Sequence, residues 1–257
     1  MRKKSLKLCG FTVIMGIFGA FLRWLQNINI FEADTELAIS HSPWSYAVVI
    51  FALLFAVLLF VWLRRYRAVG FASSYPAIYS ETVPFVTVAA YIIGVIIAIG
   101  GVLTISRAVS TSKTAFDLIL GLFSLICAAG MTTFILSVGK PEKKNSGAFG
   151  SAVAVFFLCF WLIASYKYSA SDPVIWHFAP RLLTISATIL AFYFIAGFVF
   201  NKPKPLTSLY FSLLGTFMCL AVLADSYPLG EQFITVGFLA AMTLLSFSQV
   251  SGAKKAT

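Results

Sequence analysis

The sequence predicts an all-α, polytopic bundle of about eight transmembrane helices with both termini in the cytoplasm, and three observations support this prediction. Of the 257 residues, 60% are hydrophobic and 11% are charged, whereas soluble domains carry roughly 25% charged residues. The apolar residues form long unbroken runs, as helices in lipid do, and a membrane β-barrel would instead alternate polar and apolar positions. The cationic residues gather in alternate loops, which orients the chain.

Each apolar run is long enough to cross a hydrocarbon core about 30 Å thick at a rise of about 1.5 Å per residue. We expect a single membrane domain over residues 1–257, because the chain has too few polar residues for a separate soluble domain. The first and seventh runs are among the shortest. The expected spans are residues 8–25, 44–63, 83–105, 114–138, 148–166, 173–200, 206–224 and 232–250.

The first span also has the layout of a signal peptide, with a basic segment at residues 1–7 and an apolar segment at residues 8–22. A cleaved signal ends in a small-x-small site. No such site follows here, and Arg23 and Trp24 close the segment. We therefore expect an uncleaved first span and keep cleavage as the alternative.

Prolines and capping residues mark the ends of the later spans. Asp172 followed by Pro173 predicts an N-cap with proline at the first helical position of the sixth span. The segment 202–205, with two prolines, cannot continue a helix and separates the sixth span from the seventh. Similar breaks lie at residues 81–84, 139–141 and 228–230.

The cationic residues orient the chain. Of the 19 lysines and arginines, 14 fall on the side of the N-terminus and 5 on the other. Because cytoplasmic loops carry the excess of lysine and arginine, the N-terminal side is predicted to be cytoplasmic. The acidic residues lie mostly on the opposite side, which agrees with this orientation. We therefore expect a multi-pass membrane protein with both termini in the cytoplasm.

The net charge of +10 does not indicate a nucleic-acid partner, because the basic residues lie between membrane spans and follow the orientation rule. The bilayer is the expected partner. The four cysteines lie in or at the ends of apolar runs, far apart in the sequence. We interpret Cys9, Cys127, Cys159 and Cys219 as small packing residues.

Small residues recur at intervals of four on two spans. Ala90, Gly94 and Ala98 share a face of the third span, and Gly237 and Ala241 share a face of the eighth. Such faces let helices approach closely in lipid. We expect them to pack within the bundle, with a homodimer interface as the alternative.

The five tryptophans fall near span ends, where an aromatic belt anchors helices at the membrane surface. We interpret them as anchors and not as ligand-stacking residues. They are Trp24, Trp44, Trp62, Trp161 and Trp176.

The usual catalytic signatures are absent from the sequence: no zinc-protease motif, no glycine-rich phosphate loop, no nucleophile elbow and no paired-cysteine motif. The two histidines, His41 and His177, lie in different loops and make a poor metal site. We therefore expect no enzymatic activity, no cofactor and no metal. An intramembrane enzyme for lipid-linked substrates stays a weaker alternative, with His177 and Asp172 or Asp117 as its only acid–base residues.

The outer end of the sixth span holds the most unusual ionisable residues. His177 and Arg181 are four residues apart, so they share a helix face. A helix that begins at Pro173 places Arg181 about 12 Å down its axis, and a charge within a span is a functional-site hypothesis. The alternative is that Arg181 snorkels outward and pairs with a loop acid for a structural purpose.

Three further charged residues lie near the same side. Asp117 either caps the fourth span beside Lys113 or is the counter-ion of Arg181. Arg23 precedes an acidic loop with which it is expected to pair. Asp225 flanks the last outer turn, together with Glu231. The loop acids are Glu32, Asp34 and Glu36, and the candidate site comprises Arg181, His177, Asp117, Asp225, Asp172 and Arg23.

The segments FGAFLRWLQ at residues 18–26 and FEADTELA at residues 31–38 resemble the opening of a group of uncharacterised bacterial multi-span membrane proteins. The resemblance covers roughly a tenth of the chain. It implies a bacterial inner-membrane protein and carries over no functional residue.

Two functions remain open. The first is a small-molecule permease, or its ligand-binding membrane subunit, with a shallow outward-facing polar pocket. The second is a non-enzymatic scaffold, assembly or sensor subunit that binds a membrane-protein partner or forms a homo-oligomer. Ion-coupled transporters place polar groups at mid-depth on broken helices, and the predicted spans carry mainly small hydroxyls there, which argues against an ion-coupled pump.

Overall fold

The computed structural model confirms an all-helical membrane bundle. It describes residues 2–30, 42–65, 69–70, 84–110, 115–138, 140, 144–170, 172, 174–251 and 254–255. Within these residues eight helices are long and apolar enough to cross a membrane. They are α1 (Arg2–Asn29), α2 (Pro43–Arg64), α4 (Pro84–Ser110), α5 (Ala115–Ser137), α6 (Lys144–Ser169), α7 (Ile175–Val199), α8 (Pro205–Val222) and α9 (Leu229–Ser251). The only strands in this part of the chain are the two-residue segments β1 (Val69–Gly70) and β2 (Lys254–Lys255), which pair with each other.

The helices match the predicted spans, with two instructive differences. The first span, expected to be among the shortest, is the longest helix, because α1 runs for 28 residues and includes the basic segment at its start. The start of α7 also differs, since it begins at Ile175 after the N-cap Val174. Asp172 does not cap this helix. Its Oδ1 accepts the N–H of Val174 at 2.8 Å, which fixes the turn before the helix.

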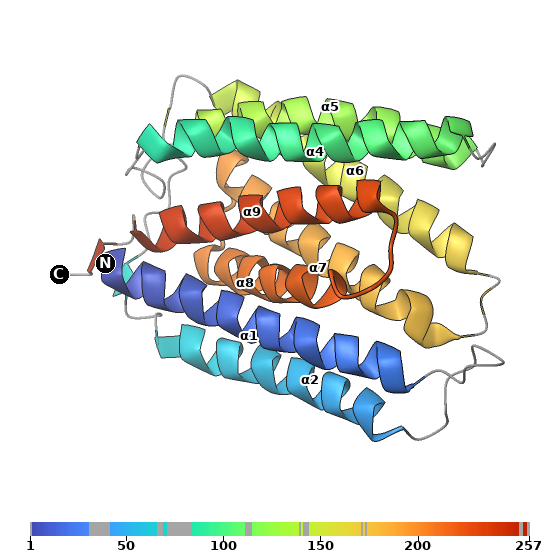
Figure 1. Ribbon diagram of the computed structural model, residues 1–257. Coiled ribbons are helices and arrows are strands. Elements are labelled where there is room, and N and C mark those ends of the chain that lie inside the picture. Colours follow the sequence, from blue (N-terminus) through green and yellow to red (C-terminus); the bar gives the residue numbers. More distant parts are fainter. Residues whose placement is uncertain are drawn as a thin grey trace.

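The helices lie roughly side by side, and α1 begins at the same end of the bundle at which α9 finishes (Figure 1). We name this the basic end, because Lys7, Arg64, Lys202 and Lys204 lie there, and we name the opposite one the far end. An even number of spans requires both chain ends on one side. That this side is cytoplasmic remains a prediction.

Two layers flank a central group of helices. The pair α4 and α5 lies along one edge in Figure 1 and packs against α9 and α6, whereas α1 and α2 lie along the other edge. Helices α7, α8 and α9 pack between them, with α8 against α1. The least buried span is α2, which packs on α1 and α8.

Glycines allow the closest helix contacts. A Cβ at Gly94 would collide with the Thr132 side chain of α5, and one at Gly237 would collide with Ile97 of α4. A Cβ at Gly100 would lie 2.7 Å from the backbone oxygen of Gly230, so α4 and α9 touch through their main chains. These contacts confirm that the small-residue faces pack within the bundle.

Candidate functional site

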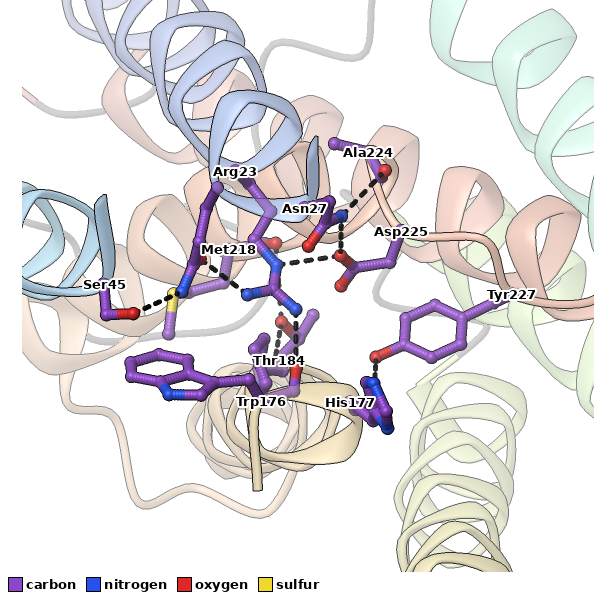
Figure 2. Close-up of polar contacts among 12 residues, drawn as sticks. Arg23, Asn27, Ser45, Trp176, His177, Thr184, Met218, Ala224, Asp225 and Tyr227 are labelled. Atoms are coloured by element: carbon purple, nitrogen blue, oxygen red, sulfur yellow. Dashed lines mark hydrogen bonds and ion pairs between the residues drawn. The ribbon is translucent and has the colours of Figure 1, made fainter. Parts of the chain in front are cut away.

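A buried arginine on α1 connects this helix to α7 and to the turn between α8 and α9 at the far end (Figure 2). The Arg23 side chain, on α1, is 4% exposed, and its Nε donates to Asp225 Oδ1 at 2.8 Å. Its Nη1 donates to Gln26 Oε1 at 2.6 Å. Asn27 Nδ2 donates to the same carboxylate oxygen of Asp225, also at 2.8 Å. The charge on Arg23 is therefore paired, which a buried charge in a membrane requires.

The third bond of Arg23 depends on a proline in another helix. Pro180 lies inside α7 and has no N–H, so the carbonyl of Trp176, four residues earlier, loses its helical donor. Arg23 Nη2 donates to that carbonyl oxygen at 2.7 Å. An unpaired carbonyl in the membrane would be costly, so the arginine completes the hydrogen bonding that the proline interrupts.

In the described part of the chain, the carboxylate that contacts Arg23 lies far from it in the sequence. This carboxylate belongs to Asp225, which is 202 positions away. The acidic loop that contains Glu32, Asp34 and Glu36 lies outside the described residues. The sequence favoured the nearby acidic loop as the partner of Arg23, because no sequence pattern links α1 to the turn between α8 and α9.

A second buried ion pair joins α7 to α9. The Arg181 guanidinium contacts the Glu231 carboxylate, and the two side chains are 14% and 11% exposed. Trp161 Nε1, on α6, donates to Glu231 Oε2 at 3.2 Å. The Arg181 guanidinium carbon lies 4.9 Å from the centre of the Tyr227 ring and 6.0 Å from the centre of the Trp161 ring. Arg181 therefore points into the bundle and does not snorkel to the membrane surface.

Two predicted roles change with this geometry. Asp117, a candidate counter-ion of Arg181, lies close enough for an electrostatic interaction, as does Arg107, but the contact partner is Glu231. Trp161 is only 4% exposed, so it is not a membrane-surface anchor. Its indole holds Glu231 in place.

A small cavity lies beside the second ion pair. Its lining includes Arg181, Glu231 and Tyr227, with Thr184, Thr188 and Cys219 farther along α7 and α8. The centre of a water molecule can occupy about 10 Å³ of the cavity, which leaves room for roughly one water. The cavity thus combines a cation, an anion and an aromatic ring with hydroxyls in one pocket.

His177 and Asp172 form a third pair, at the start of α7. His177 Nδ1 lies 2.9 Å from Asp172 Oδ2. The Val174 N–H, and then His177, hold the pKa of the Asp172 carboxyl below its usual value of 3.8, although partial burial opposes them. This pair lies near the surface, because the two side chains are 36% and 32% exposed.

Tyr227 lies among the three pairs and interacts with each, and no sequence pattern identified it. Its hydroxyl donates to the backbone oxygen of His177 at 3.0 Å, and its ring lies against Arg181. Burial, and then the nearby Asp225 carboxylate, raise the pKa of Tyr227 above its usual value, so the hydroxyl stays a neutral donor. Five of the six predicted site residues thus belong to pairs that Tyr227 links, and Asp117 interacts with Arg181 at longer range.

Comparison with known proteins adds no relative: the chain matches no protein-family model, no curated protein and no solved structure. The resemblance of residues 18–26 and 31–38 to bacterial multi-span membrane proteins therefore stays a prediction.

Proposed function

We propose that this chain is a non-enzymatic, multi-pass protein of the bacterial cytoplasmic membrane that binds a small polar molecule at the Arg181–Glu231 cavity. It would do so from the outer side, either as a permease or as the ligand-binding subunit of one. The observation that carries the proposal is that this ion pair lines a cavity.

The contrast between the two buried ion pairs supports this assignment. Arg23 and Asp225 are absent from the cavity lining, and Arg23 bonds to three groups of the protein itself. Arg181 and Glu231 hold each other beside the cavity, and their other neighbours are mainly aromatic rings. The Arg23–Asp225 pair stabilises the fold. Arg181 and Glu231, in contrast, can exchange their contact with each other for contacts with a ligand.

The balance of charge favours a zwitterionic ligand such as a small amino acid. Separating Arg181 from Glu231 would leave two unpaired charges in a low-dielectric site, which is costly. A ligand that carries both a carboxylate and an ammonium group would pair with both residues, and the Trp161 and Tyr227 rings also favour an ammonium group. Because the cavity holds about one water, the two side chains must separate when the ligand binds.

Thermal unfolding of the purified full chain in detergent micelles tests the proposal. Glycine and L-alanine are expected to raise the unfolding temperature, since binding to the folded state stabilises it. Acetate and methylammonium, each with one of the two charges, are the matched ligands and are expected to have little effect.

The variant Arg181→Gln/Glu231→Gln removes both charges together and keeps polar groups of similar size. Its unfolding temperature should no longer respond to glycine, while the exposed-residue control Arg64→Gln should respond as the wild type does. The proposal fails if no amino acid shifts the unfolding of the wild type, or if the double variant responds equally.

A second candidate function is a scaffold, assembly or sensor subunit with a membrane-protein partner. The observation that favours it is the exposure of α2, on which Leu53, Leu54 and Val57 are each about 60% exposed. Cysteine crosslinking along this face in native membranes discriminates, because a partner helix gives a crosslinked product and lipid alone does not.

A further inference from the structure

A second hollow lies on the outside of the bundle at the basic end, away from the Arg181–Glu231 cavity. It is a groove of about 320 Å³ between α6 and α7, closed at one end by the turn that leads into α8. Its walls include Phe156, Tyr193 and Phe200, which are 68%, 59% and 55% exposed. Such exposed aromatic side chains on membrane-spanning helices face lipid.

Two lysines close the groove. Lys202 and Lys204 belong to its lining, and the lining contains no acidic residue, so its net charge is positive. The Lys204 ammonium lies 5.8 Å from the centre of the Phe194 ring, on the groove wall. A third ammonium group is close, because Lys144 Nζ donates to Asn201 Oδ1 of the same turn at 2.9 Å.

The turn that carries these lysines is fixed by its own backbone. Asn201 has a φ of 58°, in the left-handed region, directly after α7. The Lys202 N–H donates to the Gly197 oxygen at 2.7 Å and the Asn201 N–H donates to the Phe198 oxygen at 3.4 Å, which together form a Schellman motif. A Cβ at Gly197 would lie 2.9 Å from the Lys202 oxygen, so the glycine permits this approach. The two cations are thus held at the rim and do not depend on a flexible loop.

We propose that this groove binds an anionic phospholipid, with the phosphate between Lys202 and Lys204 and an acyl chain along the apolar wall between α6 and α7. Charge complementarity selects this occupant, because basic pockets between membrane helices at the cytoplasmic surface bind anionic headgroups. The inference is independent of the ligand at the Arg181–Glu231 cavity, which lies at the far end.

Native mass spectrometry of the purified full chain in detergent, titrated with dioleoyl phosphatidylglycerol, tests the proposal. Phosphatidylglycerol should bind more tightly than the zwitterionic dioleoyl phosphatidylcholine. The variant Lys202→Gln/Lys204→Gln should lose this preference with a fall in affinity of roughly 25-fold, about fivefold for each lysine. Lys7→Gln, which removes an exposed lysine of α1 at the same end, should leave the affinity unchanged.

A second variant tests the apolar part without changing charge. Ala152 lines the groove on α6, and Ala152→Trp should fill it and weaken phosphatidylglycerol binding. Glycerol phosphate, which has the headgroup but no acyl chain, should not compete with the lipid. Equal binding of the two lipids, an equal effect of Lys7→Gln, or full competition by glycerol phosphate would each overturn the proposal.

Discussion

Removing Arg23 should destabilise the bundle strongly, because the guanidinium satisfies three groups at once. In Arg23→Ala the Asp225 carboxylate, whose side chain is 6% exposed, loses its cation. The Trp176 carbonyl loses the donor that replaces the missing N–H of Pro180. Gln26 Oε1 loses its donor as well.

The expected size follows from these losses. Breaking a buried ion pair by removing one partner costs about 3–5 kcal/mol, since it leaves an uncompensated charge. An orphaned carbonyl adds a penalty of about 1–3 kcal/mol, part of which water at the far end recovers. We therefore expect Arg23→Ala to lower the free energy of unfolding by about 4 kcal/mol, in the upper tail of single substitutions.

The assay is unfolding by sodium dodecyl sulfate in mixed micelles, followed by circular dichroism, with the free energy extrapolated to zero detergent denaturant. Arg64→Ala is the matched control, because Arg64 is an exposed arginine at the basic end whose guanidinium lies over Phe60. It should change the free energy of unfolding by less than about 1 kcal/mol.

The double variant Arg23→Met/Asp225→Leu removes both charges together. Replacing a whole buried ion pair by apolar groups is often neutral, so this variant should be more stable than Arg23→Ala alone. If Arg23→Ala costs less than about 1 kcal/mol, or if the double variant is the less stable of the two, Arg23 and Asp225 do not stabilise the fold as a buried ion pair.

Three further outcomes are expected. Pro180→Ala restores an N–H for the Trp176 carbonyl, so a double-mutant cycle should show Arg23→Ala costing about 1 kcal/mol less in that background. Gly100→Val places a Cβ against the Gly230 carbonyl and should cost about 1–3 kcal/mol, whereas Gly10→Ala, with open space around it, should be neutral or slightly stabilising in the same assay. Because the folded state lowers the pKa of Asp172 from its usual value of 3.8, its stabilisation is fully present above that pH and is lost as the pH falls through the lower folded value. Asp172→Asn should therefore flatten the acid side of the stability profile, and an unchanged profile would contradict this.

Much of the fold could be predicted because hydropathy and proline positions act locally. The apolar runs located all eight helices, and the expected small-residue faces at Gly94 and Gly237 pack as proposed. The predicted spans differ from the observed helices at their ends, because local hydrogen bonds determine the residue at which a helix begins or ends. Asp172 is an example, since its carboxylate bonds to Val174 in the preceding turn and the helix starts later.

The candidate site was predictable only in part. A charge inside a span must find a partner, so Arg23 and Arg181 could be identified from their depth alone. The partners of these arginines could not be predicted. Asp225 contacts Arg23, and Glu231 contacts Arg181, only once the helices have packed together. Tyr227 and Trp161 have no sequence signal, since aromatic residues near span ends are expected as anchors.

If the Arg181–Glu231 cavity opens to the outer side to admit a small ligand, as we propose, a side chain that lines it becomes accessible to reagents from that side. Cys219 is its internal reporter, because it lines the cavity yet is only 2% exposed, while Cys127 is fully buried elsewhere in the core. The most direct measurement is the rate at which a membrane-impermeant methanethiosulfonate reagent modifies each cysteine in right-side-out vesicles, followed by mass spectrometry. Cys219 should react faster than Cys127 and be protected by glycine. Equal rates for the two cysteines, or no protection by glycine, would show that this cavity does not admit a small ligand from the outer side.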